Sequence, residues 1–155
     1  MTAVLSPCPG RLLPLADVPD PVFAAEMVGP GVAIDPDPGD VTVVSPIRGT
    51  AVKVHPHAFV VVDGDGLAVL VHLGINTVRL EGRGFEVLAE EGGTVEQGAP
   101  MVRWDPSTIS GPDMSPVVVV VALDRPAGSV PAPEPGATTS AGEPLFVVET
   151  SLSNP

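Results

Sequence analysis

Three histidines are the side chains best suited to chemistry, and all of them lie in one short stretch. The chain has no histidine besides His55, His57 and His72. His57 comes just before one apolar run and His72 ends the next, with Asp63-Gly-Asp-Gly66 between the two runs. Such a segment is a strong hairpin signal, so we predict that the runs pair as antiparallel strands. This pairing would bring His57 close to His72 at one end of the hairpin.

A pair of imidazoles suits three kinds of chemistry. Neutral imidazole is a common zinc ligand, although His55, beside the rigid Pro56, is the remaining histidine for a third position. Two imidazoles also suit acid–base catalysis. A third use is nucleophilic: one imidazole takes up a phosphoryl group while the other pairs with its charge. Alternatively, each histidine is simply satisfied at its own strand end, and the spacing alone leaves these interpretations open.

The composition restricts the partners and the class of protein. The chain has 155 residues with 7 Lys+Arg and 19 Asp+Glu, which gives a net charge of −12. This charge excludes free affinity for nucleic acid or anionic lipid and favours a basic protein partner. The single cysteine, Cys8, excludes an internal disulfide and a Cys-rich zinc site.

The length and the apolar runs indicate one domain that does not insert into a membrane. We expect a single domain over residues 1–155, with its core at about 6–149. The longest apolar run, Val117–Leu123, is too short to cross a bilayer, and no signal peptide is recognisable. The expected protein is therefore soluble and cytoplasmic.

The apolar pattern predicts an all-β fold. With 44% hydrophobic and 3% aromatic residues, 17 Gly and 20 Pro, the composition favours short strands and turns. We expect an antiparallel β-sandwich or compact barrel. The predicted strands are Arg11–Leu15, Val32–Ile34, Val41–Val44, Thr50–Val54, Ala58–Val62, Leu67–His72, Val78–Leu80, Met101–Trp104, Val117–Leu123 and Leu145–Glu149.

Three segments depart from this strand pattern. Pro21–Met27 and Gly84–Glu90 have apolar residues at roughly helical spacing, so each is predicted to form a short helical turn that packs on the sheet. The stretch from about 126 to 143 is rich in Pro, Gly and small polar residues. We predict that it is a flexible loop without a function of its own.

Seven stretches, taken together and in order, resemble a known family. They are Val18–Gly29, Gly31–Pro36, Ser45–Thr50, His57–Phe59, Val71–Val78, Leu80–Phe85 and Glu91–Gly98. Each is weakly specific alone, but the ordered set with both histidines is highly specific. Over about residues 6 to 149, the chain resembles the glucose-type enzyme IIA of the bacterial phosphoenolpyruvate-dependent sugar phosphotransferase system.

The resemblance implies a role for each of the two histidines. In this family the histidine of the V-H-x-G-I motif, here His72, carries a phosphoryl group, and the histidine of H-A-F, here His57, supports it. A backbone carbonyl, here that of Gly74, orients the nucleophile. The implied function is a soluble phosphohistidine carrier that accepts from HPr and delivers to the IIB domain of a sugar permease. No cofactor would be required, and His57 and His72 could hold zinc.

The resemblance also implies a shallow apolar depression around the histidines of a β-sandwich, where partner proteins dock. We call its expected border the apolar rim; it comprises Val22, Phe23, Met27, Val28, Phe59, Leu70 and Val78. Asp20 would attract a basic donor. Among the departures from the family pattern, Asn76 stands where an Asp is usual, and His55-Pro56 stands in place of Thr-Asn.

Other classes of protein remain as alternatives. A regulatory binding protein would report sugar supply to protein partners through the phosphorylation of His72. A biotinyl or lipoyl carrier is suggested by a turn near Glu91, but the only lysine, Lys53, lies in an apolar strand. A zinc peptidase of related fold would use the H-x-H spacing of His55 and His57, although no convincing ligand Asp precedes it.

Overall fold

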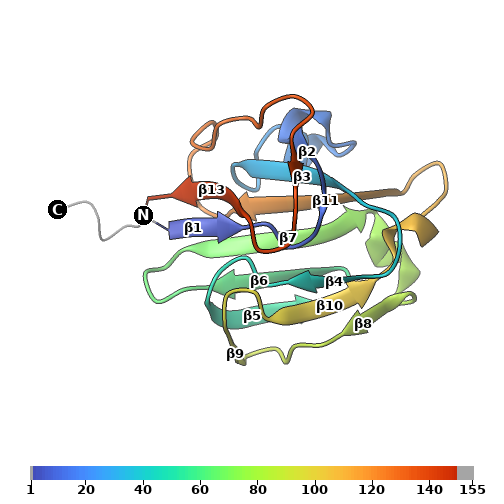
Figure 1. The fold of residues 1–155 in the computed structure, drawn as a ribbon, viewed down its shortest axis with the longest axis horizontal. Helices are drawn as coiled ribbons and strands as arrows, with labels where there is room; N and C mark the ends of the chain where they lie inside the picture. The colour runs from blue at the N-terminus through green and yellow to red at the C-terminus, as the bar shows by residue number, and fades with distance from the viewer. Residues whose placement is uncertain (1, 150–155) are drawn as a thin grey trace.

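The computed structural model describes residues 2–149, which form antiparallel sheets with very few helical turns. The predicted all-β sandwich is confirmed (Figure 1). The largest sheet has eight strands, and two smaller sheets face it. In spatial order, the large sheet contains β12 (Thr138–Thr139), β2 (Gly10–Pro14), β3 (Gly31–Pro36), β11 (Ser115–Ala122), β7 (Ala68–Ile75), β6 (Ala58–Val62), β5 (Gly49–His55) and β9 (Thr94–Val95).

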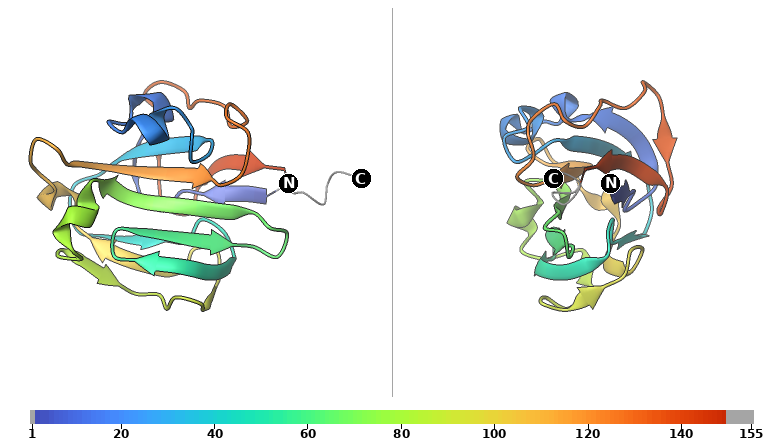
Figure 2. Two further views of the ribbon diagram at one scale, coloured as in Figure 1. Left: turned by 180° about the vertical axis from the view of Figure 1, so that it is seen from behind. Right: turned by 90° about the vertical axis from the view of Figure 1, so that its left-hand side faces the viewer.

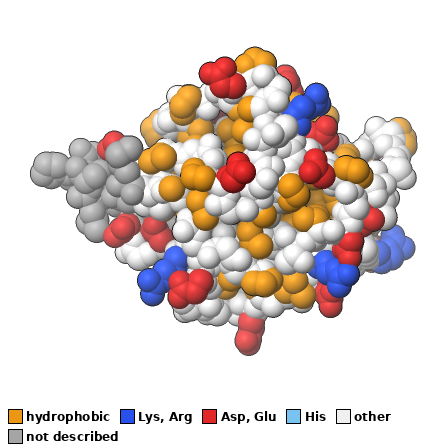
Figure 3. Space-filling model, viewed as in Figure 1, with side chains coloured by type: hydrophobic (Ala, Val, Ile, Leu, Met, Phe, Trp, Pro, Cys, Tyr) orange, Lys and Arg blue, Asp and Glu red, His pale blue; other side chains and the backbone are white. Residues whose placement is uncertain are grey.

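The smaller sheets cover one face of the large sheet. One contains β4 (Val41–Val44), β10 (Pro100–Trp104) and β8 (Phe85–Val87), and the other pairs β1 (Thr2–Leu5) with β13 (Pro144–Val148). The two layers are seen edge-on in the right panel of Figure 2. Their facing side chains form the inner core, which includes Phe59, Val61, Val69, Val71, Val43, Met101, Trp104 and Phe146. On the outer surface of the smaller sheets, acidic, basic and apolar side chains are scattered without one dominant kind (Figure 3).

The opposite face of the large sheet carries a second cluster, the outer core. It comprises Leu15, Val18, Phe23, Ala33, Ile75, Val117, Val119 and Val121. The sheet side of this cluster comes mainly from β11, whose valines are buried on both faces. A central strand covered on both sides needs apolar residues at every position, which explains the unbroken valine run. The left panel of Figure 2 shows this face, with the N-terminal segment over its upper part.

The N-terminal segment is held over the sheet by two short turns. A 3-10 helix, η1, spans Leu15–Asp17, and α1 spans Pro21–Ala24. Asp20 is the N-cap of α1, since its carboxylate accepts hydrogen bonds from the amides of Val22 (2.9 Å) and Phe23 (3.3 Å). Pro21 occupies the first turn, where its missing N–H costs nothing. The helical turn predicted over 21–27 is therefore present, but it is shorter than expected.

Two predicted elements are wrong in type. Val78–Leu80 lies not in a strand but in the 3-10 helix η2 (Thr77–Leu80), flanked by Asn76 and Glu81 in left-handed conformation. The hydroxyl of Thr77 donates to the carbonyl of Leu73, which closes this turn. Instead of a helical turn, Gly84–Glu90 contains β8, which pairs with β10 so that the rings of Phe85 and Trp104 stack. So short a helix cannot repay its nucleation cost, whereas a strand gains its hydrogen bonds from β10.

The Pro- and Gly-rich segment 126–143 contacts the body of the fold at several points. It contains the strand β12, which pairs with β2, and Val130 within it is buried in the inner core. The amide of Gly128 donates to the carboxylate of Glu26, just beyond α1, at 3.1 Å. The segment thus supports the turn that carries α1. Within residues 2–149, no helix has the length and apolar character needed to cross a membrane.

Candidate functional site

His72 lies on β7, one of the central strands of the large sheet, between β11 and β6. Its neighbours in the ladder are Val119 on one side and Ala58 on the other. Directly paired residues share a face of the sheet, and Val119 belongs to the outer core. The imidazole of His72 therefore projects from the outer face, where it is partly buried.

The hairpin between β5 and β6 brings His57 to the same place. His55 pairs with Ala58, so Pro56 and His57 form the two-residue connection between the strands. The carbonyl of His57 accepts a hydrogen bond from the amide of Leu73 at 2.7 Å, which ties this turn to β7. The rings of His57 and His72 meet edge-on, with centroids 5.3 Å apart and an interplanar angle of 74°. The two histidines are thus adjacent, as the hairpin signal predicted.

A hydrogen bond fixes which nitrogen of His72 is available. The Nδ1 atom lies 2.6 Å from the carbonyl oxygen of Gly74. A carbonyl can only accept, so Nδ1 carries the proton, and the lone pair of the neutral ring lies on Nε2. Gly74 has a φ of +81°, and a Cβ at this position would lie 2.5 Å from Cγ2 of Thr77 and 2.8 Å from the carbonyl oxygen of Ser115. This site therefore accepts glycine and no larger residue without rearrangement.

Both imidazoles are held in the neutral form. The pKa of His72 is lowered, mainly by burial, while its hydrogen bond to Gly74 and the charge of Asp20 partly oppose this shift. The pKa of His57 is lowered by burial and by repulsion from the positive forms of His72 and His55. Imidazole normally titrates near pH 6.5, so these shifts leave both rings neutral at neutral pH. A neutral Nε2 is what a nucleophilic role requires.

The apolar rim is only partly as expected. The ring of Phe23 packs edge-on against the ring of His72, with centroids 5.3 Å apart, and is nearly buried. Val22, Met27 and Val78 are exposed at 45%, 75% and 57% of their surface. Leu70 and Val28 are partly buried and pack against the outer core. Val22, Met27 and Val78 are therefore available to a partner. Phe23, Leu70 and Val28 belong to or pack against the outer core beneath this surface.

Phe59 does not belong to the rim, and this prediction is wrong. The side chain is fully buried in the inner core. Phe59 pairs with Val71, which also points into the inner core, because successive side chains of a strand alternate between its faces. The family resemblance placed Phe59 in the rim, but the strand places its side chain on the other side of the sheet.

Asn76 follows directly on β7 and holds a loop beside the site. It adopts a left-handed conformation (φ 64°), which Asn tolerates better than most residues. Its side-chain amide donates to the carbonyl of Asp113 at 2.6 Å, and the carboxylate of Asp113 lies 3.9 Å from Arg79. No pattern in the sequence predicted these contacts or the packing of Thr77 and Ser115 around Gly74. Asp113 is far along the chain and carries no motif.

The histidines do not converge on a metal position. His55 is exposed, and its ring stacks on that of His57, with centroids 5.8 Å apart and an interplanar angle of 18°. Stacked rings lie side by side rather than pointing at one centre. Within residues 2–149, no group of three or more His, Cys, Asp or Glu side chains is placed to hold a metal ion. The arrangement supplies the pair His57 and His72, without the third ligand that zinc sites need.

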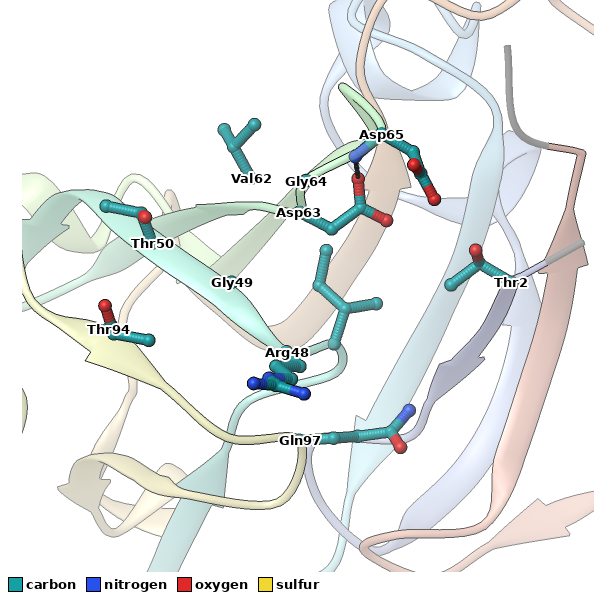
Figure 4. A pocket seen from close by; sticks show the side chains of 11 residues that line it. Thr2, Arg48, Gly49, Thr50, Val62, Asp63, Gly64, Asp65, Thr94 and Gln97 are labelled. Atoms are coloured by element: carbon teal, nitrogen blue, oxygen red, sulfur yellow. Dashed lines mark hydrogen bonds between the residues drawn. The ribbon is translucent and has the colours of Figure 1, made fainter. Parts of the chain in front are cut away.

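A hollow at the other end of the β6–β7 hairpin is a different feature (Figure 4). It has a volume of about 540 Å³ and surrounds the turn at Asp63. Its longer polar side chains are already engaged: Arg48 lies 3.4 Å from Glu96, and the amide of Gln97 donates to backbone carbonyls. The length of β6 separates this hollow from His57 and His72.

Comparisons with known proteins agree with this geometry. A family model described as "phosphoenolpyruvate-dependent sugar phosphotransferase system, EIIA 1" matches residues 2–127. The PTS system glucose-specific EIIA component of Staphylococcus epidermidis is 44% identical over 104 residues, and that of Staphylococcus aureus is 45% identical over 105. Each match covers 66% of this chain, and it covers 61% and 62% of the two relatives. The match thus spans about three fifths of the length of these curated relatives.

A solved structure extends the likeness to nearly the whole chain. Glucose permease IIA from Mycoplasma capricolum superimposes with a TM-score of 0.81 over 94% of both chains, at 29% sequence identity. Neither comparison favours a zinc peptidase or a separate regulatory binding protein. The family match covers most of the chain and includes both histidines, their hairpin and Gly74. The chain therefore belongs to the EIIA 1 family of the phosphoenolpyruvate-dependent sugar phosphotransferase system.

Proposed function

We propose that this protein is a phosphohistidine carrier for sugar uptake, with Nε2 of His72 as the phosphorylated atom. HPr donates the phosphoryl group, and the IIB domain of a sugar permease accepts it. The observation that carries this proposal is the hydrogen bond from Nδ1 of His72 to Gly74. It leaves one nucleophilic nitrogen, on the outer face of the sheet, in contact with a second imidazole.

The transfer is balanced without any further reactant. The lone pair of Nε2 attacks phosphorus, and the bond between phosphorus and the donor's imidazole nitrogen breaks, with its electron pair returning to the donor. On delivery a nucleophilic atom of the IIB domain forms a new bond to phosphorus while the phosphorus–Nε2 bond of His72 breaks, and the electron pair of the broken bond returns to the ring. The proton stays on Nδ1 throughout, where it is hydrogen-bonded to the carbonyl oxygen of Gly74. No metal or cofactor of this chain takes part in the proposed step.

His57 supports the transfer electrostatically. Charge gathers on the phosphoryl oxygens in the transition state, and a hydrogen-bond donor already aimed at them stabilises it. The ring of His57 meets that of His72 at 5.3 Å, so its N–H can reach a group attached to Nε2. Phe23 also packs against the His72 ring and keeps water from it. A shielded phosphohistidine is passed to protein partners more often than it is lost to hydrolysis.

The surface around the histidines suits protein partners that approach in turn. Val22, Met27 and Val78 offer exposed apolar contact area. Asp20, beside His72, and the overall charge of −12 attract a basic donor. We place the carrier in the cytoplasm, where HPr and the IIB domain meet it. Asp20, Asn76 and Gly74 act as supporting residues, and the domain spans the whole chain.

Phosphorylation and mass measurement test this function. The protein is incubated with phosphoenolpyruvate, enzyme I and HPr, and its intact mass is then recorded. We expect a gain of one phosphoryl group that is lost in acid. The His72→Gln variant should fold and gain nothing, whereas the matched His57→Gln variant should still be labelled. Full labelling of His72→Gln, or no labelling of the wild type, would overturn the proposal.

A further inference from the structure

The three imidazoles form a continuous row from the solvent to His72. The ring of His55 stacks on that of His57, and the ring of His57 meets that of His72 edge-on. The two centroid distances are 5.8 Å and 5.3 Å. His55 is exposed, and the ring contacts link it to His72 through His57.

The backbone holds the rings of His55 and His57 in this arrangement. His55 is the last residue of β5, and its ladder partner, Ala58, opens β6. Only Pro56 separates the two histidines, and its ring fixes one backbone dihedral of the turn. The turn also packs against the segment after η2, where a Cβ on Gly82 would lie 3.3 Å from Cγ of Pro56. The stacked contact is thus built into a short, restrained hairpin.

The electrostatic surroundings of His57 are dominated by its imidazole neighbours. Burial lowers the pKa of His57 most, followed by the charges of His72 and then His55. Asp20, which caps α1, acts on His72. The other charged side chains on the elements around the hairpin are Lys53 on β5, Glu91, which accepts from the amide of Val54, and Arg79, Glu81 and Arg83 on η2 and the turn after it.

We propose that His55 is a positioning residue for His57: its stacked ring holds the imidazole of His57 edge-on to His72, in place for an arriving phosphoryl group. This inference rests on the proposed carrier function of His72. A phosphoryl group on Nε2 brings negative charge next to His57 and favours its protonation. His55 opposes protonation in the free protein, so the charge on His57 then follows the phosphorylation state of His72.

Titration of the free protein tests the electrostatic half of the proposal. The ring-proton resonances of the three histidines are followed by NMR over pH 4–9 in the wild type and in His55→Asn. Removal of one repelling imidazole should raise the pKa of His57. Lys53→Gln is the matched control, since it removes a cation from the same strand without touching His57, and it should leave the titration of His57 unchanged. An unchanged pKa of His57 in His55→Asn would overturn the proposal.

Single-turnover delivery tests the positioning half. The phosphorylated proteins are mixed with a IIB domain, and loss of label is followed in time. His55→Asn should deliver about 2- to 10-fold more slowly, because one ring contact that orients His57 is lost. His55→Phe keeps a ring on His57 and should recover most of the wild-type rate. Equal rates for wild type and His55→Asn, or no recovery in His55→Phe, would contradict positioning by the ring.

These outcomes separate the inference from the function on which it rests. If the wild type takes no phosphoryl group from HPr, the carrier function is wrong. If the wild type is labelled but His55→Asn titrates and delivers as the wild type does, only the role of His55 is wrong.

Discussion

Nδ1 of His72 donates to the carbonyl oxygen of Gly74 at 2.6 Å, across only two positions of the same strand. The positive φ of Gly74 (+81°) departs from the extended conformation of β7 and turns this carbonyl toward the ring. The strand itself thereby decides which nitrogen of His72 keeps a free lone pair, and it does so before any partner binds. Such preorganised orientation is typical of histidines whose second nitrogen does chemistry.

Gly74→Ala should therefore impair both stability and labelling. The new Cβ meets Thr77 and the carbonyl of Ser115, and the backbone is strained at positive φ, which together should cost at least about 1–3 kcal/mol in the free energy of unfolding. Phosphorylation by HPr should slow about 10- to 100-fold, as for other residues that orient a reactive histidine. Denaturant unfolding and quenched labelling measure the two effects.

Gly84→Ala is the control for this variant. Gly84 also has a positive φ (+86°), but a Cβ there meets nothing within 4 Å. It should lose stability through backbone strain alone and be labelled at the wild-type rate. Equal stability of the two variants, with equal labelling, would show that the surroundings of Gly74 do not matter.

His57→Gln should separate acceptance from delivery. The variant keeps a hydrogen-bond donor but loses the imidazole that faces His72. We expect near-normal labelling by HPr and delivery to the IIB domain slowed by about 100-fold or more, the cost of losing one preorganised donor in comparable sites. Rapid-quench measurement of both half-reactions decides this. Unimpaired delivery would make His57 a purely structural residue.

Asn76→Asp should change the association rate more than the chemistry. A carboxylate at position 76 should speed phosphorylation by HPr about 2- to 10-fold at low salt. The gain should shrink at higher salt, which screens the charge. The variant also loses the hydrogen bond to the carbonyl of Asp113, so it should be less stable by about 1 kcal/mol. Transfer rates at two ionic strengths, with a denaturation curve, test both effects. Equal transfer rates at low salt would place Asn76 outside the donor's footprint.

Phosphoryl transfer should survive removal of metal ions. His57 and His72 provide two ligands and His55 stacks instead of converging, so the described residues offer no complete zinc site. Labelling in the presence of a chelator should match labelling without it. Loss of labelling in chelator, followed by recovery when zinc is added, would show that a metal ion takes part.

The sequence predicted the strand pairs best where the signal was local. The Asp63–Gly66 turn, with an apolar run on each side, led directly to the β6–β7 hairpin and to the contact between His57 and His72. Strand alternation also explains the main error in the site. Ala58 is paired with His72 on the outer face, so the next residue of β6, Phe59, faces the inner core. A motif places residues along the chain, and the pleat then assigns each one to a face.

Other features could not be read from the sequence because they depend on distant partners. Val78–Leu80 has strand-like residues, but the left-handed residues on both sides force a 3-10 turn. β8 exists because β10 supplies its hydrogen bonds, and three residues alone give no periodicity to detect. The amide of Asn76 finds its acceptor, Asp113, far along the chain in a loop without a motif.

The position of His72 on a central strand, paired on both sides, has a consequence for turnover. In the carrier that we propose, a rigid sheet cannot swing a phosphorylated His72 ring from one binding surface to another, so donor and acceptor must use the same patch in succession. The reaction is then of the ping-pong type, and a tightly bound donor would act as an inhibitor of delivery. Flux through such a carrier is limited by how quickly each complex dissociates, which favours brief, weak encounters over high affinity.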